Sequence, residues 1–200
     1  MYRSGDCYNR IVQLAVNIYC DYQLTEFPIN AKRLCERMGV RLIPYSAFDE
    51  INRKTLLSRS DYGFYVPMLE GFPPRIFYND DPAIVGSEER IRFYLLHELK
   101  HYVNEDINSE ADDDDLADYF AKFMACPIPF LVLLRIDTPD EIAARFGVSF
   151  TVAEITASNV RNRINKYGTK IFDYEKPLIQ LLFSEFKLHD CIRGDEAYEQ

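Results

Sequence analysis

The chain has 200 residues, of which 48% are hydrophobic and 28% charged, and this balance is typical of a soluble globular protein of about one domain. Its formal net charge of −9 opposes general binding to the phosphate backbone of nucleic acids. Five cysteines without a C-x-x-C pair indicate reduced thiols in a cytoplasmic protein, and no apolar run predicts a signal peptide or a membrane-spanning helix.

The first part of the chain predicts two helices, a strand, a weaker helix and a hairpin. These elements are expected over 7–22, 28–39, 40–45, 47–59 and 63–78. Pro67 cannot donate to a β-ladder, so it indicates a strand at the edge of a sheet. Extended peptides commonly pair with such an edge, whereas an ordinary hairpin that shields the core is the alternative interpretation.

A helix expected over 87–103 carries the clearest functional motif, His97-Glu98-x-x-His101. The two histidines are four residues apart, so their side chains project from one face of the helix and can bind one Zn²⁺. Glu98 lies one step around the same turn, where it can act as general base on a water molecule bound to the metal. Two aromatic residues of this helix are candidate oxyanion or substrate-side helpers, namely Tyr94 and Tyr102.

An acidic stretch over 110–115 leads into a helix expected over 116–125 and supplies the candidate third metal ligand. Catalytic zinc sites use three protein ligands and one water, and a carboxylate is an accepted ligand. If this helix packs against the histidines, it presents Asp114 to the metal and Asp118 to the second ring nitrogen of a histidine. Asp113 and Asp115 compete for the third ligand position if the helix is rotated, and Glu110 is a weaker candidate because it is expected to precede the helix. The remaining histidine, His189, is an outside candidate that is expected in an exposed tail.

The last part of the chain predicts a helix-turn-helix-like pair followed by a polar extension. The expected helices span 130–136, 138–146, 151–167 and 177–186. Thr138-Pro139-Asp140-Glu141 has the pattern of a capping box, Gly147 marks the turn, and Thr151 is the expected cap of the next helix. Because the chain is acidic, direct nucleic-acid contact through 138–167 is not expected, and no residue is assigned to nucleic-acid binding.

Three motifs, in this order, resemble the ImmA/IrrE family of zinc metallopeptidases. They are Arg92-Phe93-x₃-His97-Glu98-x₂-His101, Ala117-Asp118-x-Phe120-Ala121-x₃-Ala125-x-Pro127 and Phe146-Gly147-Val148-Ser149. The resemblance covers roughly residues 8–166. It implies a gluzincin-like enzyme with a short β-sheet beside the zinc helix, from a family that cleaves or inactivates helix-turn-helix repressors and is common in phages, mobile elements and stress responses.

Two positions depart from the pattern of that family. Lys100 stands where the family usually has Gly, so its cation must find room beside the site or extend outwards to water. Asp114 stands where the family has a Glu ligand, which is one methylene longer. The longer zinc signature with a third His is excluded, because Asn104 and Ile107 occupy its Gly and His positions.

Taken together, the sequence predicts an α+β fold, mostly helical and zincin-like, with a small β-sheet beside the HExxH helix and a helix-turn-helix-like pair after it. Residues 1–170 are expected to form one metallopeptidase-like domain, with 138–167 as a subregion and 171–200 as an extension. The predicted function is a zinc-dependent endopeptidase of the anti-repressor type, which acts on a helix-turn-helix transcriptional repressor and has no membrane partner. The alternative hypothesis is a catalytically weak or inactive regulator that binds a repressor, or binds DNA through 138–167.

Overall fold

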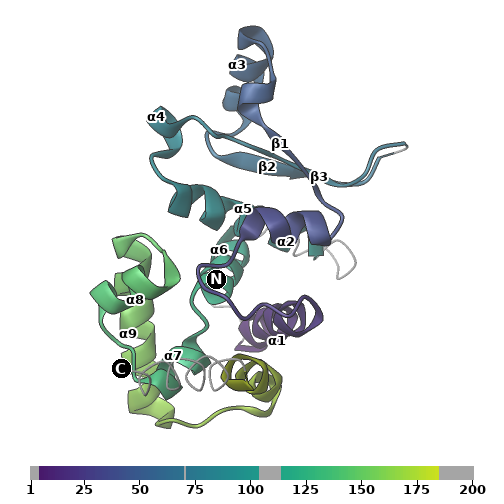
Figure 1. Cartoon of the computed structure of the whole chain (residues 1–200). Coiled ribbons are helices and arrows are strands. Elements are labelled where there is room, and N and C mark those ends of the chain that lie inside the picture. Colours follow the sequence, from purple (N-terminus) through teal and green to yellow (C-terminus); the bar gives the residue numbers. More distant parts are fainter. Residues whose placement is uncertain (1–4, 70, 104–113, 185–200) are drawn as a thin grey trace, which may run out of the picture.

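The computed structural model describes residues 5–69, 71–103 and 114–184, which form an α+β fold dominated by helices (Figure 1). The helices are α1 (Gly5–Asp21), α2 (Ala31–Arg37), α3 (Glu50–Arg59), α4 (Pro82–Val85), α5 (Glu88–Val103), α6 (Asp114–Ala125), α7 (Ile128–Leu134), α8 (Pro139–Phe146) and α9 (Phe150–Tyr167). The strands are β1 (Arg41–Pro44), β2 (Gly63–Val66) and β3 (Arg75–Tyr78), and two 3-10 turns are η1 (Tyr45–Ala47) and η3 (Asp173–Glu175). A last helical segment covers 176–184. The predicted fold class is therefore confirmed at this coarse level.

The three strands form one mixed sheet in the order β1-β3-β2. Strand β3 is central, parallel to β1 and antiparallel to β2, so the predicted hairpin is confirmed. Strand β2 lies at the edge and ends at Val66, directly before Pro67. Gly63 allows β2 and β3 to approach closely, because a Cβ at this position would lie 2.8 Å from the carbonyl oxygen of Phe77. Figure 1 shows α3 on one side of this sheet and α2 and α5 on the other.

Helix α5 is the central element, since it packs against β2, β3 and α2 on one side and against α6 on the other (Figure 1). Four apolar residues at helical spacing form one stripe of α5, as expected of an amphipathic helix: Ile91, Leu95 and Leu99 are buried and Val103 is partly buried. Helix α6 meets it with a face that contains two small residues, and this allows a close approach of the two helices. The buried residues of α6 include Ala117, Phe120, Ala121 and Met124, and the helix also packs against α1.

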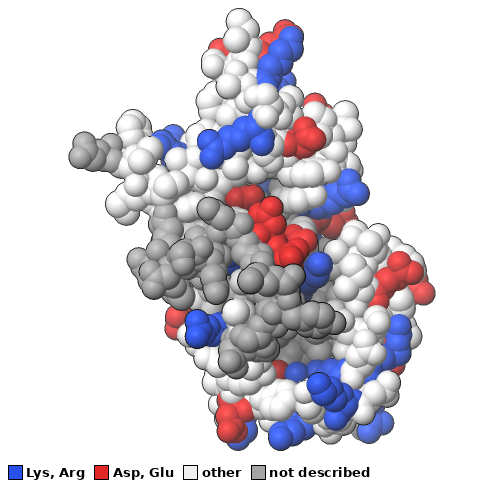
Figure 2. Space-filling view, turned by 180° about the vertical axis from the view of Figure 1, so that it is seen from behind, with Lys and Arg blue, Asp and Glu red and all other residues white. Residues whose placement is uncertain are grey.

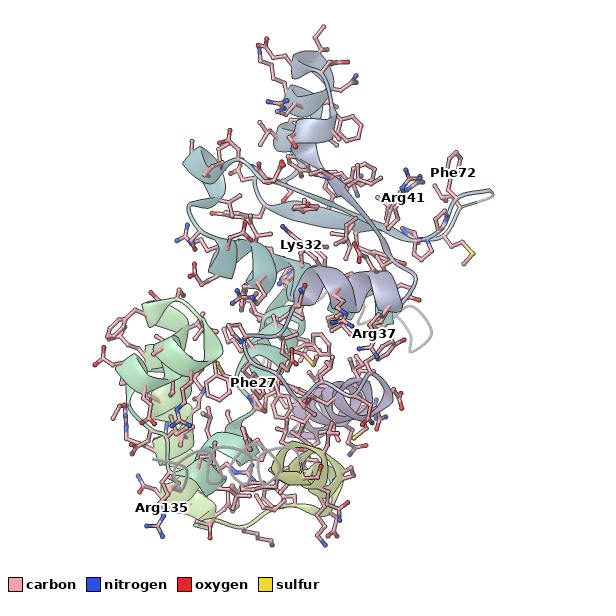
Figure 3. All side chains as sticks on the ribbon, viewed as in Figure 1. Phe27, Lys32, Arg37, Arg41, Phe72 and Arg135 are labelled. Carbon is pink, nitrogen blue, oxygen red and sulfur yellow. The ribbon has the colours of Figure 1, made fainter. Side chains whose placement is uncertain are left out.

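The turn between α8 and α9 is anchored to the rest of the fold. Gly147 has a φ of 58°, and a Cβ there would collide with the ring of Pro28. The guanidinium of Arg92 on α5 donates to the carbonyl oxygen of Gly147 at 2.5 Å. The ring of Phe27 packs against that of Phe146 with 4.6 Å between centroids, and Figure 3 shows Phe27 between the α8–α9 pair and the N-terminal helices. The Phe146–Ser149 motif thus has a structural role.

Two details of the predicted helix starts are wrong. Thr138 precedes α8 as expected, but its side chain makes no capping hydrogen bond, so the predicted capping box is not formed. Helix α9 begins at Phe150, one residue before the expected cap Thr151. Its N-cap is Ser149, whose Oγ accepts from the backbone N–H of Val152 at 3.4 Å. The left-handed Gly147 turns the chain early enough for Ser149 to take this position.

In the described part of the chain, the segment Asp114–Leu134, which comprises α6 and α7, is long and apolar enough to cross a membrane by length and composition. Within the fold, 72% of its most apolar window is buried. A mostly buried segment of this kind is typical of the core of a soluble protein, as its packing against α1 and α5 indicates.

Candidate metal centre

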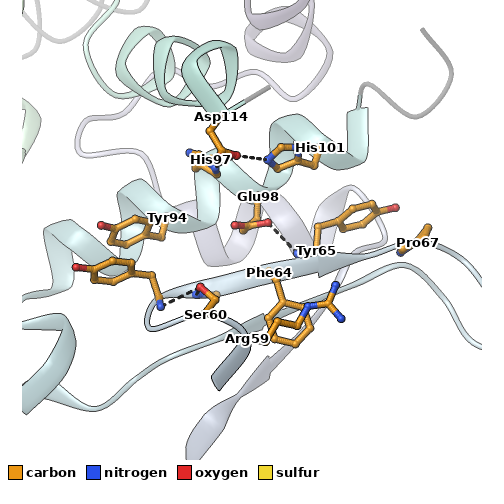
Figure 4. A pocket seen from close by; sticks show the side chains of 12 residues that line it. Arg59, Ser60, Phe64, Tyr65, Pro67, Tyr94, His97, Glu98, His101 and Asp114 are labelled. Carbon is orange, nitrogen blue, oxygen red and sulfur yellow. Dashed lines mark hydrogen bonds and ion pairs between the residues drawn. The ribbon is translucent and has the colours of Figure 1, made fainter. Parts of the chain in front are cut away.

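The two histidines of the HExxH motif lie next to each other on α5, with 5.3 Å between their ring centroids. Asp114 is the first residue of α6 and lies against both of them (Figure 4). Its Oδ1 is 3.7 Å from Nε2 of His97 and 3.9 Å from Nε2 of His101. One ligand atom from each of these three residues lies within 4.8 Å of the other two, so the group could hold a metal ion.

These separations fit a single small cation. Imidazole nitrogens and carboxylate oxygens bind Zn²⁺ at about 2.0–2.2 Å, so two ligand atoms of a tetrahedral site lie roughly 3.4 Å apart. The carboxylate–imidazole distances of 3.7 and 3.9 Å are close to this value. Figure 2 shows acidic side chains gathered midway between the sheet and the lower helices, where negative charge favours a cation.

Asp118 lies behind the first histidine. Its Oδ1 is 2.9 Å from Nδ1 of His97, so the carboxylate orients the ring with Nε2 towards Asp114. This is the contact expected of a residue that supports a metal ligand, since it selects the tautomer whose Nε2 lone pair is available. Lys122, one helical turn later, places its Nζ 3.9 Å from the other carboxylate oxygen of Asp118.

Glu98 is held between α5 and the edge strand. Its Oε2 accepts a hydrogen bond from the backbone N–H of Tyr65 at 2.8 Å (Figure 4). Burial raises the pKa of Glu98, while the nearby His97 and the Tyr65 N–H lower it and the negative charge of Asp114 raises it. The net effect is an upward shift of the pKa. A carboxylate whose pKa is moved towards neutrality is better suited to accept and return a proton.

The site opens into a cleft of about 700 Å³ between β2 and α5. This volume is large enough to hold several residues of a peptide. The walls come from the end of α3, the segment that leads into β2, β2 itself, α5 and the first residue of α6. The residues that line the cleft are Arg59, Ser60, Tyr62, Gly63, Phe64, Tyr65, Pro67, Tyr94, His97, Glu98, His101 and Asp114.

The two candidate tyrosines occupy different environments. Tyr94 lines the cleft and stacks on Tyr62, with ring centroids 4.1 Å apart and an interplanar angle of 11°. Burial, and next the Tyr62 hydroxyl, raise the pKa of Tyr94 to about 12, so it keeps its proton at neutral pH. The hydroxyl of Tyr102 instead donates to the carbonyl oxygen of Met38 at 3.0 Å. Tyr102 thus ties α5 to the end of α2, and this contact gives no support to a helper role.

Of the other candidates for the third metal ligand, the structure describes only Asp115. Among the described residues, the metal-binding group consists of His97, His101 and Asp114, and Asp115 is exposed on α6 outside this group. Glu110, Asp113 and His189 lie outside the described residues. Lys100, which stands inside the motif, is completely buried at 0% exposure, so it does not extend outwards to water.

Several basic residues of the α9 region make contacts within the protein. A guanidinium N–H of Arg161 donates to the carbonyl oxygen of Asp137 at 2.7 Å, and Nη2 of Arg163 donates to Glu175 at 2.7 Å. Lys170 lies over the ring of Phe172, with its Nζ 5.4 Å from the centroid. These cations therefore stabilise the packing of α9 and η3.

Sequence reasoning did not find the residues that α3 and β2 contribute to the cleft. Tyr65 contributes a backbone N–H, which no residue pattern identifies, and Arg59 lies in a segment without a functional motif. The only available signal was the predicted edge strand near Pro67. Comparison of the chain with protein-family models, with curated proteins and with solved structures finds no match.

Proposed function

We propose that the chain is a zinc-dependent endopeptidase. The observation that carries this proposal is the placement of His97, His101 and Asp114 around one point, with Glu98 beside them in the same cleft. Two imidazoles and one carboxylate are a zinc ligand set, and a site at the wall of a cleft leaves a fourth position for water. The resemblance to the ImmA/IrrE metallopeptidases supports the same assignment.

The side chains have distinct roles in this proposal. Bound Zn²⁺ would polarise a peptide carbonyl and lower the pKa of a bound water. Glu98, fixed through one oxygen by the Tyr65 N–H, would accept the proton of that water on its other oxygen and pass it to the leaving amine. Asp118 would keep Nε2 of His97 directed at the metal. Tyr94, protonated at neutral pH, is a donor in the wall of the cleft.

The edge of β2 offers a way to bind an extended peptide. In a strand the backbone N–H and C=O groups of one residue point to the same side. Here the backbone groups of Gly63 and Tyr65 point away from β3, towards the open edge of the sheet. The N–H of Gly63 donates to Ser60 and that of Tyr65 donates to Glu98, whereas Pro67 has no N–H. A peptide would therefore pair with this edge mainly by donating its own N–H groups to carbonyl oxygens of β2.

The substrate class comes from the resemblance. The ImmA/IrrE family acts on helix-turn-helix repressors, so we infer that a transcriptional repressor of this type is the protein substrate in the cytoplasm. Incubation of the zinc-loaded protein with such a repressor, encoded next to it, should produce a defined cut that mass spectrometry can locate.

The substitution Glu98→Gln tests the enzymatic proposal. The variant should retain about one equivalent of zinc after dialysis, as measured by atomic spectroscopy, and should cleave no peptide. His97→Ala and His101→Ala should lose the metal itself. If Glu98→Gln still cuts the bonds that the wild type cuts, the proposed role of Glu98 is wrong. A folded wild-type protein that binds no zinc would support the alternative of a non-catalytic regulator.

A further inference from the structure

Arg59 is a cation in the wall of the cleft that the proposed mechanism does not use. It is the last residue of α3 and its side chain is exposed. Its guanidinium carbon lies 4.2 Å from the centroid of the Phe64 ring. Among the described residues that line the cleft it is the only Lys or Arg, and within that described part of the chain it forms no ion pair with a carboxylate.

The cleft extends over both faces of the edge strand. Phe64 points to the face opposite α5, where its ring stacks on Phe77 with 5.2 Å between centroids. The neighbouring Tyr65 points to the other face and meets Tyr102 of α5. Figure 4 accordingly shows Arg59 and Phe64 on one side of β2 and the metal-binding side chains on the other.

A peptide that pairs with β2 would present its side chains alternately to these two faces. The side chains on one face would meet the metal side of the cleft, and those on the other would meet Arg59. We propose that Arg59 is a specificity-determining residue that binds the carboxylate of an Asp or Glu side chain of the substrate, on the face of β2 opposite the metal ligands. This inference rests on the proposed endopeptidase function.

The chemistry of the two faces favours an acidic side chain at Arg59 alone. The Phe64 ring covers one face of the guanidinium and leaves the N–H groups on its edge available for a two-point contact with a carboxylate. On the metal side, the carboxylates of Glu98 and Asp114 repel an acidic side chain. A purely structural role, in which Arg59 only stabilises the C-terminus of α3, would change stability and leave peptide selection unaltered.

Cleavage of a proteome-derived peptide library tests this inference. The zinc-loaded wild type should cut preferentially where Asp or Glu occupies one fixed position near the scissile bond. Arg59→Gln should remove this preference and lower kcat/KM for acidic peptides about tenfold relative to kcat/KM for matched neutral peptides. Arg59→Glu should exchange the preference at that position for Lys or Arg. The matched control is Lys54→Gln, which removes a cation of α3 that pairs with Glu50 and does not line the cleft.

The outcomes separate the inference from the function on which it rests. If the wild type cuts the library and Arg59→Gln cuts it with the same acidic preference, the role of Arg59 is wrong and the endopeptidase proposal stands. A loss of acidic preference in Lys54→Gln would also overturn it, because that cation lies outside the cleft. If the zinc-loaded wild type cuts no peptide, the endopeptidase proposal fails, and the inference fails with it.

Discussion

The substitution Asp118→Ala measures how much metal affinity depends on the carboxylate behind His97. The contact between Asp118 Oδ1 and His97 Nδ1 is 2.9 Å long, and loss of such a contact commonly lowers metal affinity about 10- to 100-fold. The Asp118 side chain is 45% exposed, so water can replace part of the contact. We therefore expect the lower end of this range, about tenfold, which corresponds to about 1.4 kcal/mol of binding free energy. Alanine favours helices, so α6 should persist in the variant.

The assay is a competition titration in which a chromophoric chelator and the protein share a limiting amount of zinc. The matched control is Lys122→Ala, which removes the cation 3.9 Å from Asp118 Oδ2 and leaves the contact with His97 in place. Its zinc affinity should stay within about twofold of the wild-type value, because exposed ion pairs contribute little. If Asp118→Ala binds zinc as tightly as the wild type, or if Lys122→Ala weakens binding equally, the proposed orienting role of Asp118 is wrong.

Three further predictions follow from burial and backbone geometry. Burial raises the pKa of Glu98, so the metal-free protein loses stability as the pH rises through the folded-state pKa and this carboxyl ionises. With chelator present, Glu98→Gln should therefore have a higher urea midpoint of unfolding than the wild type at pH 7, and the same midpoint below about pH 4. Equal midpoints at pH 7 would contradict this. Gly147→Ala places a Cβ against Pro28 at a left-handed position, so the free energy of unfolding should fall by about 2–4 kcal/mol, and an unchanged calorimetric Tm would refute the close approach. Burial raises the pKa of Cys35 and of Cys126 to about 12. Iodoacetamide at pH 8 should therefore label both thiols only after unfolding in guanidinium, with mass spectrometry as the readout. Rapid labelling of the folded protein would show that the thiols are accessible.

Local patterns in the sequence predicted several secondary-structure elements and the direction of the two histidine side chains. The positions of His97 and His101 on one helical face follow from their spacing, because the period of an α-helix places residues four apart above each other. The hairpin, and the edge strand that ends before Pro67, follow from alternation and from the missing N–H of proline. The core stripe of α5 follows from the same helical period. Each of these features depends on residues close together in the chain.

Only the tertiary structure decided which partners meet at the site. The distance from Asp114 to the histidines depends on how closely α6 packs against α5, and two buried alanines, Ala117 and Ala121, permit that approach. The partner of Glu98 is a backbone N–H on a strand 33 residues earlier, and backbone groups leave no trace in the residue pattern. The periodicity of a helix specifies the direction in which each side chain projects from that helix. The group that it meets depends on the packing of elements far apart in the chain, which local spacing does not encode.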